Sequence, residues 1–275
     1  MTASTVTGRT KIGESDEAGE AAGPLRLPGG RDGRDPERAI KRGPSRVPRE
    51  LVLATQRDRL YDGLVRTVAE HGYGNATVTD ICRAAGVTRP AFYEHFDGKE
   101  GAFLAAYTHG TDLLLEVLDQ AYAAHTEGWR SAVWQTLEIL LDVLAGAPAF
   151  AAMAIVEIEA AGPAARRRRV DLLHRFRRFF AEAPEPPGAV DRAELTDTVI
   201  GGVYSAIYQR ISTRGAGALP QLKPVLAYFV TAPFGLVDPR PPQPGPGPRP
   251  KVVLPCLPLF LAADQHSESD VNSGD

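Results

Sequence analysis

Across the middle of the chain, apolar side chains recur at intervals of three and four residues, which is the period of an amphipathic helix. The first such stretch puts Leu60, Leu64 and Val68 on one face and predicts a helix over 50–71. Gly72 and the glycine two residues later supply the break that ends it.

Two much shorter apolar segments follow this helix. Thr77 or Thr79 is placed to cap a helix that runs through Ala85, and Thr88 is placed to cap the next one. Pro90 falls in the first turn of that second helix, where proline is tolerated because its missing N–H has no helical partner. The pattern therefore predicts two helices of about eight residues joined by a tight glycine-containing turn.

The pattern stays helical as far as residue 236. A fourth helix is predicted from Lys99 to about Ala124, and the breaks at glycine and proline predict further helices over 128–146, 148–161, 164–183, 190–214 and 219–235. Because no alternating strand pattern competes with them, the fold class is predicted to be all-α. The expected divisions of the chain are 1–44, 45–108, 109–236 and 237–275.

Both ends of the chain differ in composition from the middle. Residues 1–44 are rich in Gly, Ser, Arg and acidic residues without hydrophobic periodicity, and we expect them to be disordered. Residues 237–275 begin with a proline at nearly every second position, which favours an extended segment over a helix.

Overall composition narrows the class of protein without naming a partner. The chain is 43% hydrophobic and 24% charged with a formal net charge of −3, ordinary values for a globular protein. The N-terminus has no apolar signal region and no run is long enough to span a membrane, so a cytoplasmic protein without a membrane partner is expected. Cys82 and Cys256 lie far apart in different kinds of segment, so no disulfide is expected.

The two short helices have the geometry of a helix-turn-helix, in which the second helix is presented to the DNA major groove. We expect Ile81, Phe92 and Phe96 to form the small core that locks these helices to the first long one. The polar and small residues between them would then face outward, and these are Arg89, Pro90, Ala91, Tyr93 and His95.

The stretch "AEHGYGNATVTDICRAAGVTRPAFYEHFDGKEGAFLAAY" carries a specific resemblance. The region from Leu60 to Tyr107 resembles the DNA-binding domain of the tetracycline-repressor (TetR) family of bacterial transcription regulators, through the aromatic "FYEHF" segment and the lysine that opens the fourth helix. The resemblance implies an N-terminal three-helix DNA-binding domain at 45–108. It also implies that the following helices, about six at 109–236, form a ligand-binding and dimerisation domain.

The same resemblance implies roles for individual residues. Thr88, Arg89, Pro90 and Ala91 would open the recognition helix and meet base edges or nearby phosphates, with Arg89 the best candidate for bidentate contact with guanine. Phosphate contacts are implied for a further set, namely Thr77, Thr79, Tyr93, His95 and Lys99.

The charge of this domain departs from that of a simple DNA-binding protein. Basic and acidic residues balance between Arg46 and Tyr107, whereas the segment just upstream is basic. Its cations are Arg38, Lys41, Arg42, Arg46 and Arg49. We expect this arm to follow the minor groove or the backbone of DNA; a merely solubilising tail is the alternative.

Two sets of apolar residues in the second half are candidates for the ligand pocket and the dimer interface that the resemblance implies. The pocket candidates, which fit an ordinary core equally well, are Trp134, Leu137, Phe150, Met153 and Phe176. The interface candidates lie on the last two predicted helices and are Val199, Gly202, Val203, Ile207, Leu226 and Phe229.

The sequence thus predicts a homodimeric regulator that binds a palindromic operator in double-stranded DNA. It is expected to be a repressor that an unknown small-molecule effector releases. The alternative is a sensor or protein-binding module of the same fold that lacks specific DNA binding. An enzyme is not expected, because no catalytic constellation, metal-ligand cluster or cofactor motif can be assembled from the residues.

Overall fold

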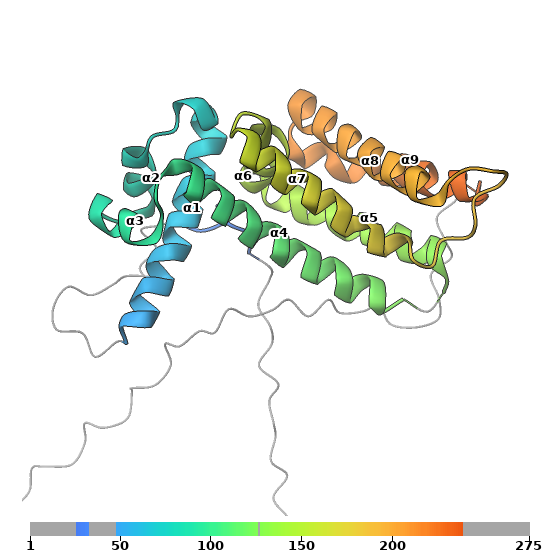
Figure 1. Ribbon diagram of the computed structural model, residues 1–275, viewed down its shortest axis with the longest axis horizontal. Coiled ribbons are helices and arrows are strands. Elements are labelled where there is room, and N and C mark those ends of the chain that lie inside the picture. Colours follow the sequence, from blue (N-terminus) through green and yellow to red (C-terminus); the bar gives the residue numbers. More distant parts are fainter. Residues whose placement is uncertain (1–25, 33–47, 126, 239–275) are drawn as a thin grey trace, which may run out of the picture. The chain divides into compact units, whose positions relative to one another are not determined.

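The computed structural model describes residues 26–32, 48–125 and 127–238, and helices are the only regular elements in these ranges. The all-α prediction is therefore confirmed. The first four helices are α1 (Arg49–Asn75), α2 (Val78–Ala85), α3 (Arg89–His95) and α4 (Lys99–Ala123). Helices α1, α2 and α3 pack against one another, and α4 leads from them into the remaining helices (Figure 1).

The predicted helix boundaries in this first part agree with the local chemistry. Gly72 has φ 76° and ψ 154°, so α1 is interrupted by a kink there, and a second short helical piece continues to Asn75. Thr77 caps α2 by accepting a hydrogen bond from Asp80 N, and Thr88 caps α3 by accepting one from Ala91 N. Gly86 ends α2 in the left-handed conformation at φ 61°, which only glycine adopts without strain.

Residues of α1 contact the turn between α2 and α3 and stabilise it. The buried Arg59 donates from Nε to Ala85 O at 2.9 Å and from Nη2 to Gly86 O at 3.0 Å, which satisfies carbonyls at the end of α2. Gly63 lets the two helices approach closely, because a Cβ atom there would lie 2.7 Å from Ala85 N. The helix-turn-helix is therefore a rigid part of a three-helix core.

The second half contains α5 (Trp129–Gly146), α6 (Pro148–Ala151), α7 (Pro163–Arg175), α8 (Arg192–Arg214) and α9 (Lys223–Thr231). Short π- or 3₁₀-helical pieces extend several of them, and these are η2 (Ala152–Val156), η3 (Glu157–Glu159), η4 (Phe176–Phe180), η5 (Ala216–Leu222) and η6 (Ala232–Phe234). The expected single helices at 148–161, 164–183 and 219–235 are thus each composite. In the last, Pro220 lies inside a 3₁₀ segment, because proline lacks the N–H that an α-helical ladder needs.

These helices pack as a bundle around a shared apolar core. α5 contacts α4, α9 and η5, while α7 lies between α4 and α8 (Figure 1). The largest fully buried side chains come from both halves and include Phe92, Phe103, Tyr107, Phe150 and Leu141. Of the described helices, none is by itself long and apolar enough to cross a membrane, and only the bent pair Trp129–Gly146 with Pro148–Glu159 passes that test together.

The prediction of disorder over 1–44 is wrong for residues 26–32. Leu27 is only 3% exposed, and Gly29 N donates to the carboxylate of Asp62 on α1 at 2.8 Å. Gly29 also lies against Val65 and Ala149, so this segment touches both α1 and α6. The sequence signal was missed because one apolar residue in a glycine-rich stretch carries no periodicity.

Among the basic arm residues, Arg38, Lys41, Arg42 and Arg46 lie outside the described residues, as do Cys256 and 239–275.

Candidate DNA-binding surface and ligand cavity

The exposed side of α3 presents the residues that the sequence singled out. Arg89, Pro90 and Tyr93 are exposed, and Tyr93 is 50% accessible, whereas Phe92 between them is fully buried. Phe92 meets Tyr93 edge-on at 5.3 Å and Phe96 at 5.6 Å, so the aromatic core fixes the rotation of α3. The helix thereby turns a short polar row outward.

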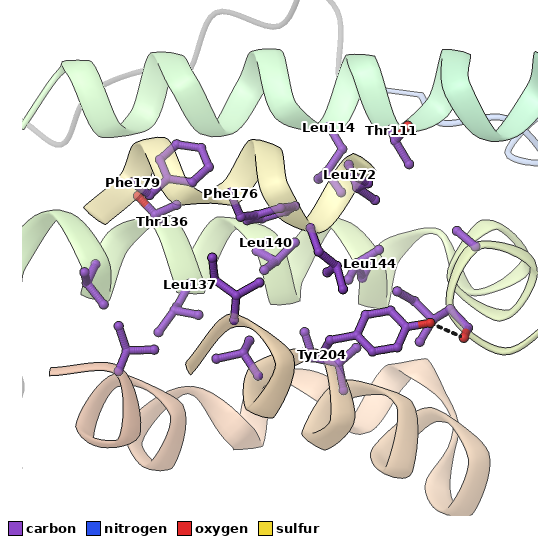
Figure 2. Close-up of a pocket in the computed structure, with 18 of the residues that line it drawn as sticks. Thr111, Leu114, Thr136, Leu137, Leu140, Leu144, Leu172, Phe176, Phe179 and Tyr204 are labelled. Atoms are coloured by element: carbon purple, nitrogen blue, oxygen red, sulfur yellow. Dashed lines mark hydrogen bonds between the residues drawn. The ribbon is translucent and has the colours of Figure 1, made fainter. Parts of the chain in front are cut away.

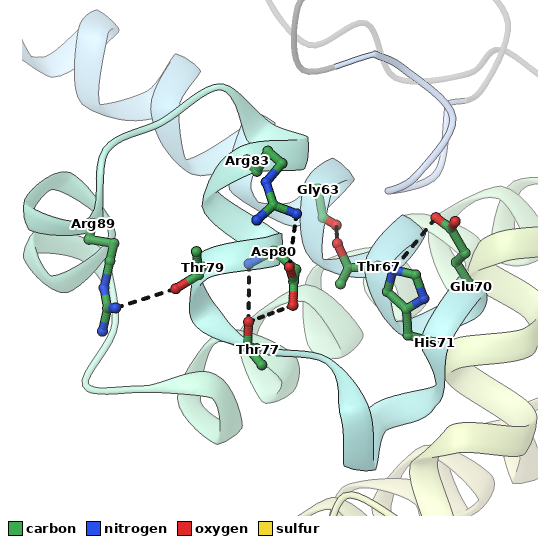
Figure 3. A network of polar contacts seen from close by, with 9 residues as sticks. All are labelled: Gly63, Thr67, Glu70, His71, Thr77, Thr79, Asp80, Arg83 and Arg89. Atoms are coloured by element: carbon green, nitrogen blue, oxygen red, sulfur yellow. Dashed lines mark hydrogen bonds and ion pairs between the residues drawn. The ribbon is translucent and has the colours of Figure 1, made fainter.

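Residues of α2 and its cap connect this row to the neighbouring helix. Arg89 Nη1 donates to Thr79 Oγ1 at 3.3 Å, which leaves most donors of the guanidinium available for another partner (Figure 3). Thr77 donates to Asp80 Oδ2 at 2.5 Å, and Arg83 pairs with the same carboxylate at 3.1 Å. The hydrogen bond from Thr77, helped by the charge of Arg83, lowers the pKa of Asp80. The Asp80 carboxylate in the first turn of α2 therefore keeps its negative charge.

Two further candidates are engaged within the protein. The ammonium of Lys99 donates to Tyr73 O at 2.7 Å and to Ala76 O at 2.8 Å, and it lies 4.3 Å from the centre of the Tyr73 ring. His95 is half-buried and its Nε2 lies 3.4 Å from Gln56 Oε1. The structure therefore shows Lys99 joining the end of α1 to the start of α4, a role that the sequence reasoning missed.

A cavity of about 110 Å³ lies inside the bundle, between α4, α5, α7 and α8 (Figure 2). Leu137, Leu140 and Leu144 form the α5 wall, and Phe176 belongs to the segment that follows α7. Its polar lining consists of hydroxyl groups, on Thr111, Tyr122, Thr136 and Tyr204. The arrangement suits a largely apolar molecule.

The predicted pocket residues separate into two groups. Leu137, Phe150 and Phe176 line the cavity, but Trp134 and Met153 do not. Trp134 lies on another face of α5, where the Lys223 ammonium stands 4.9 Å from its ring centre. Met153 is fully buried in η2, whose Ala154 and the following isoleucine reach the cavity instead. The sequence shows that Trp134 and Met153 are apolar, but it does not show which face of each helix turns toward the cavity.

The polar lining groups differ in how they are satisfied. Tyr204 Oη donates to Ile155 O at 2.9 Å, and burial raises the pKa of Tyr204 to about 12, so the hydroxyl stays protonated. Thr111 Oγ1 donates to Tyr107 O at 2.8 Å. Thr136 Oγ1 is buried and has no hydrogen-bond partner in the described part of the chain. Neither Thr136 nor Tyr204 was singled out in the sequence, because the partner of a hydroxyl depends on tertiary contacts.

The predicted interface residues are also divided. Val199 and Ile207 are 2% and 4% exposed, so they pack inside the protomer as core and the interface prediction is wrong for them. Leu226 is 2% exposed but borders the surface groove described next. Val203 and Ile207 line the cavity. Gly202 and Phe229 lie in an apolar surface groove between α8 and α9, together with Val225.

The two halves of the chain meet at a hydrogen bond that the sequence analysis did not foresee. Tyr73 N donates to Glu157 Oε2 at 2.7 Å, just after the break of α1 at Gly72. Glu157 follows directly on η2, which contributes to the cavity lining. The cavity and the helix-turn-helix are therefore connected through a few residues.

Comparison with known proteins agrees with this geometry. Residues 60–106 match the sequence profile of bacterial regulatory proteins of the tetR family. The HTH-type transcriptional repressor Rv1474c of Mycobacterium tuberculosis is 37% identical over 65 residues, which make up 24% of this chain and 35% of that repressor. The chain thus matches 35% of the length of this curated relative.

Two solved structures share the fold over a larger part of the chain. The fatty acid degradation regulator FadR from Bacillus halodurans has a TM-score of 0.52 at 19% identity, covering 62% of this chain and 97% of FadR. FadR from Bacillus subtilis, solved in complex with stearoyl-CoA, has a TM-score of 0.55 at 15% identity, covering 63% and 97%. Over residues 60–106 the chain is therefore similar to the bacterial regulatory proteins of the tetR family, and its all-helical fold is similar to that of FadR.

Proposed function

We propose that this protein is a transcriptional repressor that binds a palindromic operator as a homodimer and is released by a small molecule. The observation that carries the proposal is the outward polar row of α3, held in place by buried Phe92 and by the Arg59 clamp on the turn. A rigid helix with an exposed Arg at its first turn is what major-groove recognition requires.

In this proposal Arg89 reads a guanine, and Thr79 holds its guanidinium across the gap between α2 and α3. Thr77, Thr88, Tyr93 and His95 contact phosphates or adjacent edges, with Pro90 and Ala91 against the base surface. Lys99 contributes mainly by fixing the start of α4, since its ammonium already donates to two carbonyls.

Dimerisation is proposed through the α8–α9 groove. Val225, Tyr228 and Phe229 are 61%, 43% and 41% exposed, an apolar concentration that a lone protomer leaves in water. A two-fold axis along these helices would produce the four-helix interface common in helical dimers. It would also present two recognition helices to half-sites about one helical turn apart or more.

The effector is proposed to act by a population shift. A molecule bound in the cavity would favour one position of η2, and the Glu157–Tyr73 hydrogen bond would pass that preference to the α1–α2 connection. Operator affinity falls if the favoured position separates the two recognition helices wrongly.

The proposal is tested by fluorescence anisotropy of the full chain on duplexes from the DNA flanking its own gene, at two salt concentrations. We expect tight binding to one palindrome by two protomers, and an Arg89→Ala variant that loses its preference over scrambled DNA at unchanged stability. Arg167→Ala, an exposed arginine on α7, serves as the matched control. Equal and steeply salt-dependent binding to all duplexes would instead support a sensor of the same fold without specific DNA recognition.

The dimer is tested by analytical ultracentrifugation of Val225→Asp. Val225 is mostly exposed, so the substitution leaves the protomer core intact. We expect monomers and weakened operator binding. An unchanged dimer would place the interface elsewhere.

A further inference from the structure

The chemistry of the cavity defines the class of molecule that it accepts. We infer that the effector is an uncharged, compact, largely apolar molecule with an oxygen that hydrogen-bonds the Thr136 hydroxyl. This inference rests on the proposed function and specifies the ligand of the same cavity.

The lining argues against a charged ligand. None of the described residues that line the cavity carries a charge, and an ion buried there would lose its hydration without a counter-charge. Arg169 is a cation close to this lining, since it lies 5.2 Å from the centre of the Tyr204 ring. Its guanidinium pairs with Glu159 Oε1 at 3.0 Å, so an anion would have to compete with that carboxylate.

The lining also offers buried hydroxyls that a ligand oxygen can reach, and Thr136 carries one of them. Thr136 is 7% exposed, and its Oγ1 finds no partner among the residues that the structure describes. Burial removes the hydrogen bond that this hydroxyl makes with water in the unfolded chain, and no group in the described part of the protein replaces it. An oxygen atom of the ligand would restore a hydrogen bond. Thr111, the other threonine of the lining, differs because its hydroxyl already donates to Tyr107 O.

Position and size narrow the class further. Figure 2 shows Thr136 and Tyr204 well separated along the cavity, with leucine and phenylalanine side chains between them. The hydroxyl of Tyr204 is committed to Ile155 O, which leaves the hydroxyls of Thr136 and Tyr122 as the lining groups without a partner among the described residues. We assign the ligand oxygen to Thr136, and the variants below test that assignment. The volume of about 110 Å³ is comparable to an engineered apolar cavity of roughly 150 Å³ that takes up benzene. A single ring with a hydroxyl or carbonyl group matches these limits.

The test is isothermal titration calorimetry of the full-length protein, without DNA, using three one-ring probes. Benzyl alcohol offers a neutral oxygen, toluene offers none, and benzoate carries a charge. We expect benzyl alcohol to bind most tightly, toluene less tightly and benzoate least.

Matched variants assign the difference to Thr136. Thr136→Val keeps the shape of the side chain and is expected to reduce the preference for benzyl alcohol over toluene by about two- to tenfold. Thr136→Ser keeps the hydroxyl and should retain the preference, which guards against an effect of misfolding. Thr111→Val removes a hydroxyl that is already satisfied and should leave the preference unchanged.

Three results would overturn the inference: tightest binding by benzoate, no saturable binding by any probe, or an unchanged preference in Thr136→Val. Because calorimetry involves no DNA, these outcomes are separate from those of the proposed function. A probe that binds through Thr136 and yet leaves operator affinity unchanged would support the ligand class while arguing against release by this molecule.

Discussion

The carboxylate of Glu157 accepts a hydrogen bond from the backbone N–H of Tyr73, and this 2.7 Å contact joins the half of the chain that contains the cavity to the helix-turn-helix half. The N–H is available because Gly72, at φ 76°, interrupts the α1 ladder immediately before it. Glu157 is half-buried at the end of η2, so the contact is partly shielded from water.

Removing this carboxylate should weaken the connection between the two halves. We expect Glu157→Ala to lower the free energy of unfolding by about 1–3 kcal/mol, since a charge-assisted hydrogen bond is lost. Glu157→Gln keeps an acceptor oxygen and should lose less. Urea unfolding measures both, with Glu116→Ala on the exposed side of α4 as a control. Equal stability of Glu157→Ala and the natural protein would show that the contact is not held in solution.

The cavity can be narrowed from α4 by a substitution at Gly110, which does not itself line the cavity. A Cβ atom at Gly110 would overlap the ring of Phe150, with Cζ at 2.5 Å, and would push that ring toward the cavity that it lines. We expect Gly110→Ala to cost about 1–3 kcal/mol in overpacking. Helix propensity would offset this by roughly 1 kcal/mol, and probe binding should weaken.

The matched control lies on the same helix. The Cβ atom that Gly101→Ala adds has no neighbour within 4 Å, so only the helix propensity changes. We expect the free energy of unfolding to stay the same or to rise by up to about 1 kcal/mol. Thermal unfolding and calorimetry with benzyl alcohol measure both variants. Unchanged probe binding in Gly110→Ala would show that Phe150 moves away from the cavity.

A substitution at Lys99 can distinguish a structural role of its ammonium group, in hydrogen bonds to backbone carbonyls, from a role in binding a DNA phosphate. Lys99→Met keeps most of the apolar stem but loses two hydrogen bonds to Tyr73 O and Ala76 O. We expect a loss of about 1–3 kcal/mol in urea unfolding, because these carbonyls end up without their donor. Normal stability combined with weak operator binding would instead assign Lys99 to a DNA phosphate.

The segment over 26–32 depends on a glycine that no other residue replaces. Gly29 has φ 89°, and a Cβ atom there would lie 2.5 Å from Val65 Cγ1. Gly29→Ala should therefore release the segment from α1 at a local cost of about 1–3 kcal/mol, with the helical content unchanged. Limited proteolysis between residues 26 and 32 measures the release. Gly30→Ala is the control, because Gly30 lacks a positive φ, and equal cleavage of the two variants would argue against this anchor.

Acid should weaken the contact between α1 and α4 through His109. The His109 ring stacks on Tyr61 at 5.1 Å, and burial lowers its pKa, an effect that Asp58 partly opposes. The unfolded chain then takes up a proton more readily than the folded one. The stability that neutral His109 contributes is thus complete above about pH 6.5 and is lost as the pH falls toward its lower folded-state pKa.

His109→Phe keeps a ring on Tyr61 without a titrating group. We expect its melting temperature to fall less steeply than that of the natural protein between about pH 7 and pH 5. Part of the slope should remain, since burial also lowers the pKa of His95. Identical slopes would exclude His109 as the source.

The helix-turn-helix was predictable because its signals are local. The cap at Thr88, the glycine turn after Ala85 and the break at Gly72 each act within a few residues, and the structure has all three where the sequence predicted them. Of the two candidates for the cap of α2, Thr77 and Thr79, the structure uses Thr77. Phe92 is buried and Tyr93 is exposed, as expected from the packing of the two short helices together with the resemblance that the sequence showed.

The lining of the cavity was only partly predictable, for a different reason. Trp134 and Leu137 are equally apolar in the sequence, yet only Leu137 reaches the cavity. Which of them does so depends on the rotation of α5 against α4, α7 and α8. The same is true of Val199, which the pattern assigned to an interface and the fold buries within the protomer.

The sequence by itself determined the all-helical class, the helix boundaries of the helix-turn-helix half and the outward row of α3, since periodicity, caps and glycine conformations act over one or two helical turns. Only the tertiary structure decided the use of Lys99 as a clamp, the docking of residues 26–32 on Asp62, the Glu157–Tyr73 link and the unsatisfied hydroxyl of Thr136. These features join atoms that are distant in the chain, and their partners depend on how the helices pack, which no local pattern records.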